Sequence, residues 1–269
     1  MTSADGSRTA GFYGDELGHA NPIESARLKA LTAAFDQDTV RRLNAVIGVH
    51  GEWHCLEVGA GTGTIAQWLA RRCPRGETTA TDVDLSLLPA DQPPRLKALV
   101  HDVTRDDFPE GSFNVIHARF VLMHLPERDD VVRRMLSWLA PGGTLLIEEL
   151  VDFPCHSLPP GDPVRRSVVE ALKMLRASYG LDDNWGARAP EAFRAAGFAD
   201  VQAEASLPTF HAGAPVLDFW RLTLVALTPH LVERGVLTSA QIEEALAALA
   251  HPDHLSFPLG VIAVRGRRP

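Results

Sequence analysis

LEVGAGTG, residues 56–63, is the stretch that decides the fold of this chain. Apolar residues lead into it and predict a buried strand over 53–58, and a one-sided apolar pattern after it predicts a helix over 64–73. Three glycines in five positions permit positive φ angles and let a ligand approach the backbone. A strand, a glycine turn and a helix in this order are typical of a nucleotide-binding turn.

The residues around the turn narrow the choice of nucleotide. Thr64 stands where the dinucleotide fingerprint requires its third glycine, and no Gly-Lys-Ser/Thr follows, which excludes the P-loop. Glu57 is an acid inside the strand, and a carboxylate there would repel a pyrophosphate. It suits a ligand with a cationic end, reached directly or through water. A tight turn that binds no ligand is the alternative.

The stretch from Glu57 to Gly63 resembles the first motif of the class I S-adenosylmethionine-dependent methyltransferases, whose ligand carries an ammonium and a sulfonium. The resemblance extends to an acid after the second strand, an acid after the third and Pro-Gly-Gly at 141–143 before the fifth. It implies a Rossmann-like α/β fold: a seven-stranded, mostly parallel sheet with an antiparallel last strand. S-adenosylmethionine is then the cofactor and S-adenosylhomocysteine the product. The chain also resembles the small-molecule branch, so the expected acceptor is a secondary metabolite.

The rest of the chain divides into three parts. Residues 1–50 are expected to form an N-terminal helical lid or a brace, 51–150 the cofactor-binding core, and 151–269 the rest of the sheet with helical substrate-binding insertions. Between 53 and 149 strands are expected to alternate with helices. Further strands are predicted over 77–82, 96–101, 113–118, 144–150, 198–205 and 257–264. Helices are predicted over 23–35, 38–47, 127–139, 163–179, 190–196, 215–227 and 238–249, the last opened by the capping box Thr238-x-x-Gln241.

Ligands of open α/β sheets bind beyond the carboxyl ends of the strands, so each strand end is a candidate site. Asp82 ends the second strand and would accept both ribose hydroxyls, whereas Asp84 would cap a following helix. By the resemblance, Asp102 would accept the adenine amino hydrogen; the alternative is an Asx turn. The backbone at the end of the fourth strand would lie under the methionine part. The expected cofactor-binding residues are Glu57, Gly59, Ala60, Gly61, Gly63, Asp82, Val83, Asp102, Val103, Ala118 and Arg119.

Two residues are candidates for catalysis. His124 lies in a His-Leu-Pro run similar to one in several small-molecule methyltransferases, in some of which a histidine acts as base; a structural role is the alternative. Glu148 and Glu149 point to opposite faces of their strand, and Glu149 is the one taken as a candidate. The sulfonium is already an activated leaving group, so placement matters most, and O-, N- and C-methylation are not separated. Candidate substrate-binding residues are Tyr13, His156 and Trp220.

Composition limits the partners. A formal charge of −8 and a pI near 5.7 argue against nucleic acid. Three well-separated cysteines and histidine pairs without accompanying ligands predict no metal. With no apolar run of membrane length and no signal peptide, a cytoplasmic protein without a membrane partner is expected, as a monomer or a homodimer. The alternatives are a nicotinamide-dependent oxidoreductase, a non-methylating cyclase and a cofactor-binding regulator on the same fold.

Overall fold

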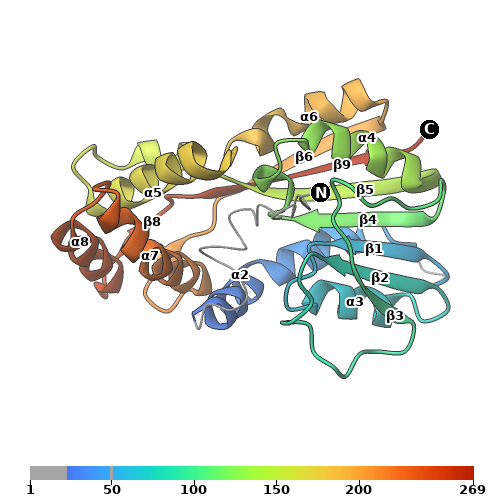
Figure 1. Ribbon diagram of the computed structural model, residues 1–269, viewed down its shortest axis with the longest axis horizontal. Helices are drawn as coiled ribbons and strands as arrows, with labels where there is room; N and C mark the ends of the chain where they lie inside the picture. The colour runs from blue at the N-terminus through green and yellow to red at the C-terminus, as the bar shows by residue number, and fades with distance from the viewer. Residues whose placement is uncertain (1–22, 49–50) are drawn as a thin grey trace, which may run out of the picture.

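The computed structural model describes residues 23–48 and 51–269. Its main sheet contains the strands β1 (His54–Val58), β2 (Glu77–Asp82), β3 (Leu96–Val100), β4 (Phe113–Arg119), β5 (Leu139–Val151), β6 (Ala199–Ser206) and β9 (Gly260–Arg267). Their order in the sheet is β3-β2-β1-β4-β5-β9-β6 (Figure 1). Strands β1 to β5 are parallel, and β9 is antiparallel to both of its neighbours. The predicted seven-stranded, mostly parallel sheet with an antiparallel last strand is confirmed.

Helices cover both faces of the sheet and continue beyond one end of it. They are α2 (Glu24–Asn44), α3 (Thr64–Arg72), α4 (Arg128–Trp138), α5 (Pro163–Tyr179), α6 (Trp185–Ala196), α7 (Pro215–Glu233) and α8 (Ser239–Ala250), with the 3-10 helices η1 (Leu122–His124) and η2 (Phe153–Ser157). A short second sheet pairs β7 (Phe210–His211) with β8 (Leu255–Ser256). None of the helices in the described part of the chain combines the length and apolar character needed to cross a bilayer.

The sheet separates two apolar layers. Helices α4 and α6 pack on one face over a core that includes Ile116, Trp138 and Phe193. Helices α2 and α3 pack on the other face over Leu43 and Val115. Alternation along each strand produces this arrangement, because neighbouring side chains point to opposite faces of the sheet.

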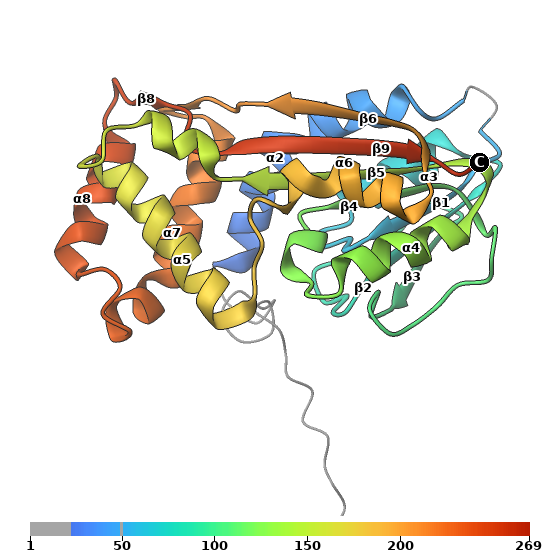
Figure 2. The ribbon, with the colours of Figure 1, turned by 90° about the horizontal axis from the view of Figure 1, so that it is seen from above.

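The helices α5, α7 and α8 gather beyond the carboxyl ends of the parallel strands (Figures 1 and 2). They enclose a third apolar cluster that includes Leu172, Leu224 and Leu249, and α2 reaches it through Leu31 and Phe35. Helix α2 therefore contacts both the sheet and the helical group. Two predicted helix starts are confirmed here: Asp162 accepts from the backbone N–H of Arg165, and the capping box at Thr238 is formed.

Four predictions about elements need correction. The helices expected at 23–35 and 38–47 are one helix, α2, because no glycine or proline interrupts it. The helix expected from 190 begins at Trp185 and contains Pro190. Strand β5 starts at Leu139, ahead of the Pro-Gly-Gly turn. Within the described residues no helix follows β2 or β3, so Asp84 caps none; Pro89, Pro93 and Pro94 disfavour one after β2.

Candidate functional site

The glycine turn after β1 has a left-handed backbone at each of its glycines. The φ angles of Gly59 and Gly63 are 68° and 76°. A Cβ on Gly59 would lie 2.4 Å from Cγ2 of Val121, and one on Gly63 would lie 2.2 Å from Cδ1 of Leu88. Both positions therefore require glycine for packing as well as for conformation.

Gly61, between them, is different because an added Cβ would meet no described atom closer than ordinary contact distance. Its φ is 51°, and the nearest atom to an added Cβ would be Cδ1 of Leu28 at 3.9 Å. The turn is tied to β2 by a hydrogen bond from Ala60 N to the Thr81 carbonyl at 2.9 Å. A ligand can approach the backbone at Gly61 while its neighbours hold the turn in shape.

The acid at the end of β2 lies against this turn. Asp82 accepts a hydrogen bond from Gly61 N at 2.9 Å through Oδ2, and one from Asp84 N at 3.3 Å through Oδ1. Asp84 is exposed and accepts from Ser86 N at 2.8 Å, away from the turn. Of the two aspartates, Asp82 has the position from which a carboxylate can reach a ribose beside Gly61.

The acid at the end of β3 makes a local turn. Asp102 Oδ1 accepts from both the backbone N–H and the hydroxyl of Thr104, at 3.0 and 2.6 Å. This is the Asx turn considered as the alternative for Asp102, and its role toward adenine stays a prediction. Val103 is buried, whereas Val83 is 64% exposed, so an apolar side chain lies open beside Asp82.

These features fit an adenosyl group. The open side of Gly61 would receive it, Asp82 supplies the acceptor for hydroxyl groups, and the exposed Val83 offers apolar contact for a planar ring. The residues expected for the nucleoside part of the cofactor thus lie at neighbouring strand ends of one edge of the sheet.

The end of β4 lies next to the turn but sends its charged side chain elsewhere. Ala118 is fully buried. The guanidinium of Arg119 turns under the sheet to α2, where it donates to Thr39 Oγ1 at 2.8 Å and to Asp36 at 2.7 Å. Only the backbone at Arg119 is therefore placed for a ligand, which agrees with the expected backbone contact and leaves that contact a prediction.

Glu57 is 4% exposed, and its carboxylate faces His117 on the neighbouring strand. The distance from His117 Nδ1 to Glu57 Oε2 is 2.7 Å. Burial raises the pKa of Glu57, and the imidazole of His117 partly opposes that effect. The acid predicted to meet the cationic end of the ligand is thus held by a partner that the sequence interpretation did not assign.

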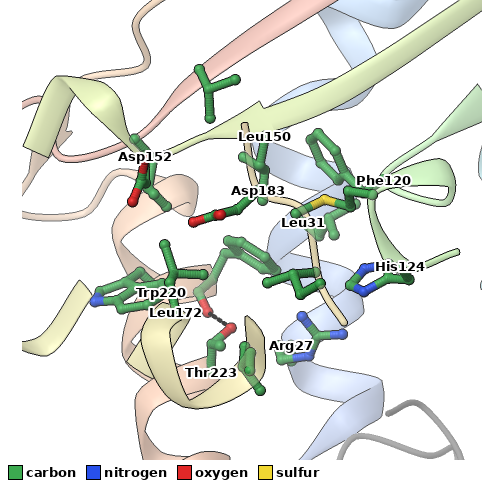
Figure 3. Close-up of a pocket in the computed structure, with 16 residues that line it drawn as sticks. Arg27, Leu31, Phe120, His124, Leu150, Asp152, Leu172, Asp183, Trp220 and Thr223 are labelled. Carbon is green, nitrogen blue, oxygen red and sulfur yellow. Dashed lines mark hydrogen bonds between the residues drawn. The ribbon is translucent and has the colours of Figure 1, made fainter. Parts of the chain in front are cut away.

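A cavity with a volume of ≈ 60 Å³ lies between the strand ends and the helical group (Figure 3). Its walls come from α2, η1, the ends of β4 and β5, and the helices α5 and α7. Most of the lining is apolar, including Leu31, Phe120, Leu175 and Trp220. Phe120 has a φ of 57°, a conformation that costs about 1–2 kcal/mol outside glycine, and it packs edge-on against Phe35 at 5.1 Å.

His124 lines this cavity beside Arg27 (Figure 3). Burial, together with the positive charges of Arg27 and Arg128, lowers the pKa of His124 to about 3. The imidazole is therefore neutral at physiological pH. Arg27 is 2% exposed, pairs with Glu24 at 2.7 Å through two hydrogen bonds, and lies over the ring of Phe219.

Glu149 does not line the cavity. Its carboxylate accepts the backbone N–H groups of Leu122 and Met123 at 3.0 and 3.3 Å, so it supports η1, the element that carries His124. Burial raises the pKa of Glu149 to about 8, although the two backbone donors act in the opposite direction. A role as base stays a prediction that these contacts do not favour.

The three candidate substrate-binding residues fall in different places. Trp220 is buried, lines the cavity and donates to Ser167 at 3.4 Å. His156 is exposed and its Nδ1 lies 3.2 Å from Arg165, outside the cavity lining. Tyr13 lies outside the described residues.

Within the described residues, Asp152, Cys155 and His156 bring together ligand types that could bind a metal. Arg176 lies 2.5 Å from Asp152, and Arg165 lies against His156. Burial raises the pKa of the Cys155 thiol to about 11. Two arginines and a thiol that holds its proton make this a poor donor set for a cation.

Arg27 and His117 were not selected from the sequence. Arg27 is part of an unremarkable helical pattern, and nothing in its surroundings marks it as buried. His117 carried a usable signal, because Glu57, His117 and Glu148 all occupy the same face of their strands in the parallel register. Assigning that register in advance would have placed the three side chains together.

The comparisons with known proteins agree with this geometry. Residues 56–145 match a family described as a methyltransferase domain. The chain is 33% identical over 171 residues to Methyltransferase str2 of Strobilurus tenacellus, an alignment that covers 62% of this chain and 60% of that protein. The chain therefore spans about three fifths of the length of this relative.

Two solved structures show the same fold. Phosphoethanolamine N-methyltransferase 2 of Haemonchus contortus, in complex with phosphomonomethylethanolamine and S-adenosylhomocysteine, matches with a TM-score of 0.60 at 16% identity, covering 91% of this chain and 57% of that one. The cyclase SpnF matches with a TM-score of 0.53 at 20% identity, covering 86% and 80%.

Proposed function

We propose that this chain, which belongs to the class I S-adenosylmethionine-dependent methyltransferases, transfers a methyl group to a small-molecule acceptor in the biosynthesis of a natural product. The acceptor is a molecule with an apolar body. The observation that carries this proposal is the cavity beyond the ends of β4 and β5, with its apolar walls and the neutral His124. Such lining with few polar groups is typical of small-molecule sites.

The chain itself contributes placement. When bound, the cofactor supplies an electrophilic methyl group on a good leaving group. Asp82 and the backbone of the glycine turn would hold the nucleoside part, while Leu31 and Phe120 would hold the acceptor's apolar surface and exclude water.

His124 would orient the acceptor. A neutral imidazole can accept a hydrogen bond from an acceptor hydroxyl and direct its oxygen. A group with a pKa of about 3 is a weak base at neutral pH. The acceptor hydroxyl would therefore lose its proton late in methyl transfer rather than before it. Glu149 would act through the backbone of η1 by fixing the position of His124.

A second reading is kept because the fold also occurs in the cyclase SpnF, and fold alone does not determine chemistry. On that reading the cofactor would bind and remain unchanged while the cavity shapes a substrate for ring closure. Both readings use the same cofactor site, so only the products separate them.

The test is to incubate the protein with S-adenosylmethionine and a panel of apolar phenols, alcohols and amines, and to measure S-adenosylhomocysteine together with the mass of each acceptor. Formation of S-adenosylhomocysteine in equal amount to a methylated acceptor would support methyl transfer. A converted acceptor of unchanged mass with intact cofactor would support the cyclase reading instead.

His124→Gln gives a sharper form of this test. With a hydroxyl acceptor, we expect kcat to fall by about 10²-fold, in the range for loss of one proton-handling or orienting group, while the cofactor's Kd stays unchanged. Thermal unfolding of the variant serves as the control for folding. Unchanged kcat would remove His124 from the reaction without affecting the proposed activity.

A further inference from the structure

A row of charged side chains lies on the face of the sheet that α2 covers. Glu57 in β1 and His117 in β4 are directly opposed in the parallel register, and Glu148 follows in β5. The exposed fractions of the three residues are 4%, 0% and 0%. Three ionisable groups are thus buried together directly below the glycine turn, and the reaction described above assigns a role to none of them.

His117 lies between the two carboxylates. Its Nδ1 is 2.7 Å from Glu57 Oε2, and its Nε2 is 3.8 Å from Glu148 Oε1. Burial alone would lower the pKa of His117, but the interactions with Glu57 and Glu148 raise it to about 9. The ring therefore carries a positive charge at neutral pH. Its Nδ1–H donates to Glu57, whereas its Nε2 faces Glu148 at ion-pair distance without a hydrogen bond.

The acid on the far side of His117 is held by α2. Glu148 Oε2 accepts from Thr39 Oγ1 at 2.9 Å and from Arg42 Nη1 at 3.2 Å. These contacts keep the pKa of Glu148 below its ordinary value despite burial, together with those from His117. Helix α2 also carries Leu28, which lies over Gly61.

Among the described residues, the carboxylate of Glu57 is hydrogen-bonded to a histidine and not to an arginine. The charged groups that surround His117 are Glu57 from β1, Arg119 from β4, Glu148 from β5 and Arg42 from α2. Arg42 bonds to Glu148, and the hydrogen bonds of Arg119 go to α2. In the part of the chain that the structure describes, His117 is the one side chain that hydrogen-bonds to the carboxylate of Glu57, so removing its imidazolium would leave a buried carboxylate without a bonded cation.

We propose that His117 is a positioning residue of the cofactor site: its imidazolium pairs with the Glu57 carboxylate and fixes it at the end of β1, and it lies between that acid and Glu148, which helix α2 holds. The inference rests on the proposed function and on the sequence-based prediction that Glu57 meets the cationic end of the cofactor. On this inference, His117 positions the carboxylate of Glu57. Thr39 and Arg42, in the C-terminal half of α2, hold Glu148.

The test measures binding of S-adenosylhomocysteine, which keeps the ammonium group, to the wild type and to His117→Gln by titration calorimetry at several pH values. We expect the wild-type Kd to vary by less than about threefold between about pH 6 and pH 8.5, because the charged imidazole opposes the effect of burial on the pKa of Glu57. In His117→Gln the Kd should be weaker by about tenfold or more at pH 6 and recover most of that loss at pH 8.5, as Glu57 loses its proton.

His54→Gln is the matched control, since His54 is an exposed histidine at the start of the same strand as Glu57. It should bind as the wild type does at every pH. A His117→Gln protein with wild-type affinity, or with the same loss at every pH, would overturn the positioning role. A wild type that does not bind S-adenosylhomocysteine at all would overturn the proposed function, and this inference with it.

A second measurement does not depend on the variant folding. The ring ¹⁵N shifts of His117 in the wild type at about pH 7.5 should show both nitrogens protonated, as expected for an imidazolium well below its pKa. A neutral ring at that pH would overturn the proposal.

Discussion

The carboxylate of Asp82 lies within hydrogen-bond distance of the glycine turn, whereas that of Asp84 points away. We predict that Asp82→Ala weakens cofactor binding by at least about tenfold, since each hydrogen bond to a charged group contributes about 1.5–3 kcal/mol. Calorimetric titration with S-adenosylhomocysteine measures this. Asp84→Ala is the matched control and should bind normally; a larger loss in that variant would show that Asp84 is the ribose acid.

Glu149 permits a prediction about stability and pH. Its folded-state pKa, about 8, lies above that of an unfolded glutamate, so its contribution to stability is complete below about pH 4.3 and is lost as the pH rises to about 8. Glutamine does not titrate. The stability of the wild type relative to Glu149→Gln should therefore fall across this window, by up to about 1.4 kcal/mol per pH unit.

Urea unfolding of both proteins at about pH 5, 6, 7 and 8 checks this, and Glu148→Gln provides the control. Glu148 is the adjacent buried acid on the opposite face, and its pKa is lowered, so its contribution is present above the unfolded pKa and is lost only as the pH falls below it. The stability of the wild type relative to Glu148→Gln should not decline from about pH 5 to pH 8. If the free energies of unfolding of the wild type and Glu149→Gln changed with pH in parallel, the raised pKa of Glu149 would be contradicted.

At the residue scale, the sequence could predict which positions end strands but not what their side chains contact. Asp82 reaches the turn as expected, yet Asp102 is engaged by Thr104 and Arg119 by α2. The Asx turn of Asp102 is local and was the alternative considered, whereas the partners of Arg119 lie 80 and 83 positions away, where no spacing rule connects them. Burial of Glu57 against His117 depended on the strand register, which alternation alone does not determine.

In the glycine turn, substitutions of two neighbouring glycines should have different effects on stability and on cofactor binding. A methyl group on Gly59 collides with Val121, while one on Gly61 meets nothing closer than 3.9 Å. Either alanine loses about 1–2 kcal/mol of stability because its backbone is left-handed. Overpacking against Val121 destabilises Gly59→Ala by about 1–3 kcal/mol more. We predict that Gly59→Ala lowers the free energy of unfolding more than Gly61→Ala does.

Binding should show the opposite order, because the open side of Gly61 is where the ligand approaches. Among molecules that remain folded, Gly61→Ala should bind S-adenosylhomocysteine at least about tenfold more weakly than the wild type does. Urea unfolding and calorimetry on the same two variants give both rankings. If Gly61→Ala keeps wild-type affinity, the cofactor does not pass over that glycine.

Elements with strong periodicity and end signals were predictable, and weakly marked connections were not. Helix α5 has its expected cap at Asp162 and ends before Gly180. The sequence predicts two helices, over 23–35 and 38–47, where the structure has α2 alone; Gln37 and Asp38, at the expected division, are exposed residues within that helix. The two-residue strands β7 and β8 are too short for any periodicity to show.

The whole molecule places its cavity where the sheet meets the helical group. Arg27 and Leu31 come from the first described helix, whereas Trp220 and Thr223 come from α7, nearly two hundred residues later (Figure 3). Sequence reasoning expected residues 1–50 and 151–256 to build the acceptor site. Residues from both ranges line the cavity, together with Phe120, Met123, His124 and Leu150 from the core, and the assignment stays a proposal. Sequence reasoning could not identify the lining residues, because they are set by how α2, α5 and α7 cross, which depends on side-chain packing across the whole chain.

The last prediction concerns residues 1–18, which precede α2. These residues lie outside the described part of the chain, and the sequence predicts that they take part in acceptor binding. Helix α2, the next element in the chain, contributes Arg27 and Leu31 to the cavity and places Leu28 near Gly61. Tyr13, in that segment, is a proposed substrate contact. Deleting Met1 to Gly18 should reduce turnover by about tenfold or more while the cofactor's Kd changes by less than about threefold, because the glycine turn and Asp82 remain. Turnover with a methylated acceptor and calorimetry with S-adenosylhomocysteine measure the two effects separately. Full turnover in the truncated protein would exclude this segment from the acceptor site, and an equal loss of cofactor binding would show that it supports the cofactor instead.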